Sequence, residues 1–116
     1  MSLNEFYTEM GADWRQVLCR FQSEQQIRRF LFQLREDQSF AHLSRALCLR
    51  DRDAAFHAAH ALMGLCRNLS LLPLERSSGA LTRALQDGAT EQEVASLYSA
   101  VQDDHARILK AIEGLN

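Results

Sequence analysis

Proline and glycine are scarce in this chain of 116 residues, and their scarcity excludes a turn-rich β fold. The sequence holds one proline and five glycines, and it shows no alternating pattern typical of strands. Long apolar runs are also missing, since no stretch reaches the roughly 18 residues of a membrane-spanning helix. The first residues lack the basic segment and apolar core of a secretory signal, so we expect none. With 47% hydrophobic residues, the composition is that of one small folded domain.

Lysine is almost absent, and the cysteines form no motif. Lys110 is the only lysine beside 12 arginines, and the net charge is −2. This charge argues against nucleic acid as the main ligand, because a duplex binder clusters basic residues on one face. The three cysteines, Cys19, Cys48 and Cys66, make neither a C-x-x-C pair nor a zinc pattern. Because each has apolar neighbours, we predict three reduced, packed thiols and a cytoplasmic location.

Apolar residues recur at helical spacing in seven successive segments. Residues suited to cap a helix start precede five of them, namely Asp13, Ser23, Asp37 or Ser39, Asp51 with Asp53, and the T-x-x-E pair of Thr90 and Glu93. We expect Gly11 to close the first helix and the fifth to run to about Asn68. Pro73 suits the first turn of the sixth helix, which we expect to stop near Gly88.

Short connections between these segments force neighbouring helices to run antiparallel. We therefore predict an all-α fold, an antiparallel up-down-up-down four-helix bundle with short N-terminal helices across one end. Residues 1–116 would form one domain, with 1–22 as the N-terminal helices and 23–116 as the bundle. A coiled-coil dimer is the alternative, but the breaks are too frequent for long heptads.

The segment from Asp51 to Leu69 has an unusual outer face. At about 100° per residue, one stripe collects its apolar side chains; these are Ala55, Ala58, Ala59, Leu62, Leu65, Cys66 and Leu69. His60 falls almost opposite this stripe, and the same outer face carries His57, Gly64 and Arg67. Phe56 and Met63 flank that face.

Gly64 is poorly explained by core packing, because an interior glycine costs a helix about 1 kcal/mol relative to alanine. On the solvent side, a missing side chain next to His60 lets another protein's backbone approach the imidazole. With Phe56 and Met63 as an apolar rim, the helix is predicted to be a docking face centred on His60. A neutral imidazole is a nucleophile near pH 7.

Residues 54–69 resemble the signature of histidine-containing phosphotransfer (HPt) domains, A-H-x-L-K-G followed by N-L-G. The matching residues are Ala59, His60, Leu62, Gly64, Asn68 and Leu69. The resemblance extends over nearly the whole chain, upstream through Asp13-Trp14 and downstream through Leu71 to Gly88.

The resemblance implies a phosphorelay carrier. His60 would accept a phosphoryl group from the aspartyl phosphate of a receiver domain and pass it to another receiver. The partners implied are a receiver domain, a hybrid histidine kinase, or both, and the resemblance implies a monomer. The family implies no catalysis and no cofactor of the chain's own, since the receiver supplies Mg²⁺. Positioning and electrostatics dominate phosphoryl transfer, which suits a carrier of this kind.

Three positions depart from the family pattern. Met63 stands where the family has lysine, Ser70 stands where it has glycine, and Thr82 stands where one subset has glutamine. The missing lysine would offset phosphoryl charge, and Arg67 or Arg83 is a candidate replacement. Met63 also keeps an alternative open, a docking module of the same fold that binds a receiver or kinase without transferring phosphate.

The remaining polar candidates are given structural roles. His57 and His60 lie one turn apart but lack a third ligand, so we expect no metal site. We predict that His42 and His105 are partly buried. The arginines on the third helix, Arg28, Arg29 and Arg35, are expected to form a solvated face.

Overall fold

A computed structural model describes residues 1–115 of the chain, and residue 116, the end of the predicted bundle segment, lies outside the described residues. This part of the chain is all-α, as predicted, with seven helices and no strand. The helices are α1 (Leu3–Glu9), α2 (Trp14–Phe21), α3 (Glu24–Leu34), α4 (Ser39–Cys48), α5 (Arg52–Asn68), α6 (Leu72–Gln86) and α7 (Glu91–Glu113). Among residues 1–115, no helix combines the length and hydrophobicity needed to cross a bilayer.

Side-chain caps begin most of these helices where the sequence predicts them. Asp13, Ser23 and Asp51 each accept a hydrogen bond from a backbone N–H in the first turn of α2, α3 and α5, and Thr90 with Glu93 forms the expected capping box. At α4 the cap residue Gln38 contributes no side-chain bond. The side chain of Asp37 takes this role instead, because its carboxylate accepts a hydrogen bond from the Ser39 N–H, in the first turn of α4, at 2.9 Å.

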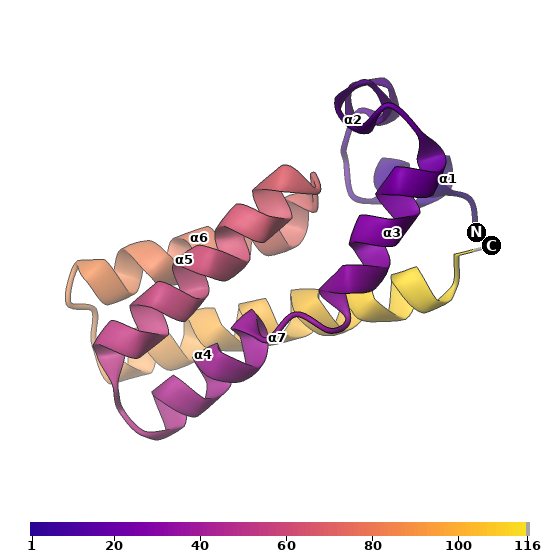
Figure 1. Ribbon diagram of the computed structural model, residues 1–116. Coiled ribbons are helices and arrows are strands. Elements are labelled where there is room, and N and C mark those ends of the chain that lie inside the picture. Colours follow the sequence, from indigo (N-terminus) through magenta and orange to yellow (C-terminus); the bar gives the residue numbers. More distant parts are fainter. Residues whose placement is uncertain (116) are drawn as a thin grey trace.

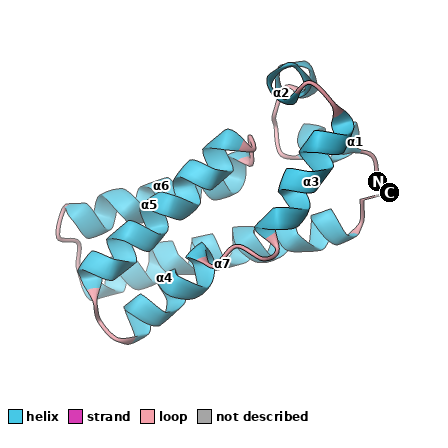
Figure 2. Cartoon of the chain, in the orientation of Figure 1, coloured by secondary structure: helices cyan, strands magenta, loops and turns pink. Residues whose placement is uncertain are grey.

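Helices α4, α5, α6 and α7 lie side by side, and each runs opposite to the one before it (Figures 1 and 2). In this group α5 packs against both α4 and α6, and α6 packs against α7. Side chains of α4 also reach α7, since the rings of Phe40 and Tyr98 stack with centroids 6.0 Å apart and Ser44 bonds the Tyr98 hydroxyl at 2.6 Å. The short turns between these helices account for the alternating directions.

The N-terminal helices are fastened to the end of α5. The buried Tyr7 hydroxyl donates to the Leu69 carbonyl at 2.9 Å, and burial raises the pKa of Tyr7, so the hydroxyl stays a donor. Arg20 donates from Nη1 to the carbonyls of Arg67 and Asn68 at 3.1 and 3.2 Å. These carbonyls lie at the C-terminal end of α5, where the helix has no further N–H donors of its own. The Arg67 carbonyl also accepts from the Ser70 N–H at 3.3 Å, so α1 and α2 add to the hydrogen bonds that close this end of α5.

The cysteines share no common environment, and the prediction of three packed thiols is wrong for two of them. Cys66 is fully buried on the inner stripe of α5, and burial raises the pKa of its thiol to about 12. Cys19 and Cys48 are exposed. Each lies on an amphipathic helix whose core contacts come from other positions, so apolar sequence neighbours did not imply burial.

Of the two histidines predicted to be partly buried, His42 and His105, only His105 is partly buried. His105 of α7 is half-buried, and its ring stacks on Phe40 of α4 with centroids 4.1 Å apart and planes 13° apart. His42 is exposed, because the contacts of α4 with α5 and α7 come from its other faces.

Protonation of His105 is expected to weaken the fold. Burial lowers the pKa of His105, and Asp37 opposes this only in part. The unfolded chain then binds more protons, so stability is present above the unfolded pKa of about 6.5 and falls as pH drops below it. We expect urea unfolding at about pH 7.5 and about pH 5.5 to show a smaller loss of unfolding free energy for His105→Gln than for the unaltered chain.

The matched control is His42→Gln, which removes an exposed histidine from α4. It should keep the pH dependence of the unaltered chain. Equal pH dependence for His105→Gln and the unaltered chain would contradict the assignment.

Candidate functional site

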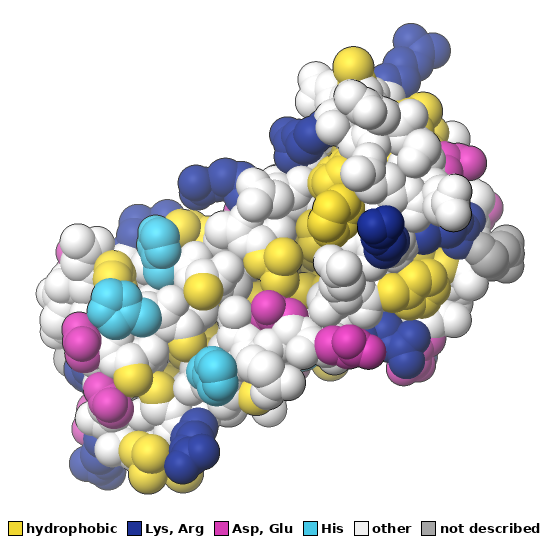
Figure 3. Space-filling view, viewed as in Figure 1, with side chains coloured by type: hydrophobic (Ala, Val, Ile, Leu, Met, Phe, Trp, Pro, Cys, Tyr) yellow, Lys and Arg dark blue, Asp and Glu magenta, His cyan; other side chains and the backbone are white. Residues whose placement is uncertain are grey.

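The outer face of α5 carries His60 as an exposed side chain in mid-helix, as predicted. Histidine side chains stand on the surface over α5 (Figure 3). The half-buried ring of Phe56, one turn earlier, stacks on His60 with centroids 6.0 Å apart and planes 25° apart. The same ring meets His57 edge-on at 5.4 Å. Phe56 therefore holds both imidazoles from the side and leaves His60 open outward.

Gly64 faces open space one turn after His60. A Cβ built at this position meets no atom within 4 Å, so packing within the chain does not require glycine here. The helix gives up the propensity of a larger residue, and the surface next to the imidazole stays bare. The open backbone that the sequence predicts next to His60 is therefore present at Gly64.

Met63 lies toward α6 and fills a slot above Gly79. A Cβ at Gly79 would stand 3.1 Å from the Met63 sulfur and 3.5 Å from Nη1 of Arg83. The Arg67 guanidinium contacts the same sulfur, with Nη2 to Sδ at 3.8 Å. The thioether of Met63 therefore lies near the guanidinium groups of Arg67 and Arg83, in space left by the missing side chain of Gly79.

The structure separates the two predicted cations. Arg67 forms an ion pair with Glu75 of α6, Nε to Oε2 at 3.3 Å, so its charge is already compensated. Arg83 is exposed and, within residues 1–115, makes no hydrogen bond or ion pair. Gly79 of α6 lies opposite Met63 of α5. Because the two helices run antiparallel, the backbone of Arg83, one turn after Gly79, lies level with His60, about one turn before Met63.

Thr82 is not part of this surface, and its predicted place near the phosphoryl group is wrong. Its side chain is only 5% exposed, and its hydroxyl donates to the Ser78 carbonyl of its own helix at 2.7 Å. The rotation of α6 that points Gly79 and Arg83 toward Met63 turns Thr82 into the core.

His57 is exposed, and its Nε2 lies 3.7 Å from an Asp53 carboxylate oxygen one turn earlier. Across the described residues, no group of three or more His, Cys, Asp or Glu side chains is placed to hold a metal ion. His57 and His60 are neighbours on the outer face of α5.

Sequence reasoning missed Gly79 and Glu75. Gly79 carried a signal, since an interior helix glycine needs a packing reason. Glu75 carried none, because its pairing with Arg67 depends on how α5 and α6 are rotated against each other.

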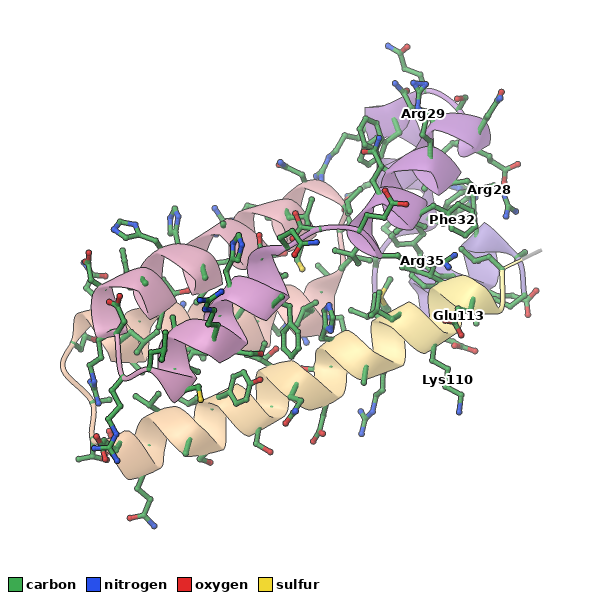
Figure 4. All side chains as sticks on the ribbon, turned by 60° about the horizontal axis from the view of Figure 1, so that its bottom comes forward. Arg28, Arg29, Phe32, Arg35, Lys110 and Glu113 are labelled. Carbon is green, nitrogen blue, oxygen red and sulfur yellow. The ribbon has the colours of Figure 1, made fainter. Side chains whose placement is uncertain are left out.

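A basic and aromatic face of α3 lies far from His60 along the molecule. Figure 4 shows Arg29, Phe32 and Arg35 on α3, with Lys110 and Glu113 of α7 nearby. Phe32 is 40% exposed, and the Arg35 guanidinium carbon lies 5.8 Å from its ring centre. Arg29 and Arg35 are exposed as predicted, whereas Arg28 is half-buried.

Comparisons with protein-family models, with curated proteins and with solved structures found no match.

The open surface at Gly64 predicts that an added methyl group is harmless to the fold. Gly64→Ala should raise the free energy of unfolding by about 0.5–1 kcal/mol, the helix propensity difference. Chemical denaturation measures this directly. Gly79→Ala is the matched control, since the Met63 sulfur must move to admit its methyl group, and its gain should be smaller. A loss of stability in Gly64→Ala would show that the site is less open than described.

Proposed function

We propose that this chain is a phosphoryl carrier of the HPt kind, in which His60 takes a phosphoryl group from the aspartyl phosphate of a receiver domain and passes it to another. The observation that carries the proposal is an exposed imidazole beside bare backbone at Gly64 on a long, well-anchored helix. The proposed fold is the antiparallel four-helix bundle, with α4 to α7 as its helices and α1 to α3 at one end. The partners would be receiver domains, hybrid histidine kinases, or both.

The phosphoryl transfer requires few groups from the carrier. The unprotonated ring nitrogen of His60 forms a bond to phosphorus as the bond between phosphorus and the aspartyl oxygen breaks, and the aspartate leaves as carboxylate. The reverse exchange loads the next receiver. Such a transfer depends on positioning and charge compensation, and the receiver supplies Mg²⁺. This chain contributes a held imidazole and room for the partner.

The surroundings of His60 match the needs of docking. Phe56 and Met63 are half-buried apolar side chains, about one turn before and one turn after His60 on α5, and a partly exposed apolar rim of this kind favours protein contact. Gly64 permits a partner's backbone to approach closely. His57 adds a polar contact one turn before His60.

A second candidate function follows from Met63. Its thioether brings no charge to the position next to His60, which favours a module that docks a receiver or kinase without accepting phosphate. Under this alternative the same face binds, and His60 stays unmodified.

Phosphate uptake separates the two functions. We expect incubation with receiver domains charged by acetyl phosphate to leave acid-labile, base-stable phosphate on the chain. His60→Gln should abolish it, because the nucleophilic nitrogen is lost, while the matched variant His42→Gln, an exposed histidine of α4 outside this face, keeps it. Binding of the receivers without any uptake would favour the docking module, and equal uptake by His60→Gln would refute the carrier.

Arg83 is expected to contribute the nearby positive charge that the family places at a lysine. Because Arg67 is paired with Glu75 and Arg83 has no partner among the described residues, Arg83→Ala should slow phosphorylation of His60 by about five- to tenfold, the effect of losing one charge-assisted contact. Arg67→Ala should have the smaller effect. Rapid-quench measurement of the transfer rate tests this order, and a reversed order would assign the role to Arg67.

A further inference from the structure

A groove of about 470 Å³ lies at the end of the molecule where α4 turns into α5 and α7 begins. It is lined by Ser44, Ala46, Leu47, Cys48, Arg50, Asp51, Arg52, Glu91, Val94, Ala95 and Tyr98. None of these residues belongs to the face around His60. In Figure 3, hydrophobic side chains flanked by basic ones gather at the end of α4.

The walls of the groove are mainly apolar. Methyl groups of α4 and α7 face it, from Ala46 and Leu47 on one side and Val94 and Ala95 on the other. The polar atoms at the Tyr98 end already have partners, because the tyrosine and Ser44 hydroxyls bond each other at 2.6 Å. These walls favour an apolar body and offer it no hydrogen bonds.

The rim of the groove is charged, unlike its walls, and one of its arginines has no ion-pair partner among the described residues. Arg50 pairs with Glu91 at 3.4 Å, and Asp51 accepts the Ala54 N–H as the cap of α5. Arg52 is half-buried and, among the described residues, makes neither an ion pair nor a hydrogen bond. The Arg52 guanidinium therefore has no counter-charge among the described residues, and an anionic group placed at the rim would form a charge-assisted pair with it.

We propose that this groove binds a small molecule that has a flat apolar body and one anionic group. The body lies between α4 and α7, and the anionic group pairs with Arg52. The volume falls within the range typical of small-molecule sites, and an apolar lining with a single placed charge is their usual chemistry. This site goes beyond the proposed function and does not depend on His60.

Two fluorescent probes that differ by one charge test the proposal. Anilinonaphthalene sulfonate has the apolar body and the anion, and phenylnaphthylamine has the same body without the sulfonate. We expect the sulfonate to bind saturably, one per chain, and to raise the melting temperature by mass action. Arg52→Gln should weaken the sulfonate by about five- to tenfold and leave phenylnaphthylamine unchanged. Arg29→Gln, an exposed arginine of α3, is the matched control and should change neither.

The cysteines give a second, independent readout on the unaltered chain. Cys48 lines the groove, Cys19 is exposed elsewhere, and both are free thiols. Alkylation followed by mass spectrometry should show that bound sulfonate slows the reaction of Cys48 at least about fivefold, in line with the occupancy of a saturated site. The rate at Cys19 should not change.

Each outcome decides the question. Binding of the sulfonate that Arg52→Gln does not weaken, or equal protection of both cysteines, would overturn the site. Probe binding that lowers the melting temperature would do the same, since it would reveal association with unfolded chains. Because His60→Gln leaves the groove intact, loss of phosphate uptake and loss of probe binding report on separate proposals.

Discussion

The inner stripe of α5 holds the rest of the molecule in place, because α5 packs against α4 on one side and α6 on the other. Small side chains make this approach close, since Ala55 and Ala59 are fully buried and the larger Leu62 fills the space between the helices. Shifting this stripe would expose apolar surface on three helices at once. The orientation of α5 is therefore fixed, and so is the direction in which His60 points.

The rigidity of α5 also depends on both of its ends. Asp51 caps the first turn, and Arg20 and Tyr7 from the N-terminal helices satisfy carbonyls at or just beyond the last turn. Through those contacts, α1 and α2 stabilise the end of α5 as well as covering the core. They add to the hydrogen bonds at the end of the helix that carries His60, so the side chain proposed to react stands on a helix anchored at both ends.

Helix boundaries, the inner stripe of α5 and the outward position of His60 could be predicted from the sequence. Each follows from the helical period and from caps that lie within a few residues of the helix they begin. The burial of Thr82, the pair of Arg67 with Glu75 and the exposure of Cys48 could not be predicted. These depend on the rotation of one helix about its axis relative to the next, which no local pattern encodes.

The interior glycines of α5 and α6, Gly64 and Gly79, differ in whether contacts within the chain explain them. Gly79 has a packing reason, because a Cβ there would lie 3.1 Å from the Met63 sulfur, which would have to shift to admit it. Gly64 has empty space where its side chain would be, so nothing inside the chain accounts for it. A residue that costs helix stability and improves no internal contact must be explained by something that comes from outside. That reasoning supports the functional surface proposed beside His60 without appeal to any relative. Met63, whose sulfur lies above Gly79 of α6, adds no charge to that surface.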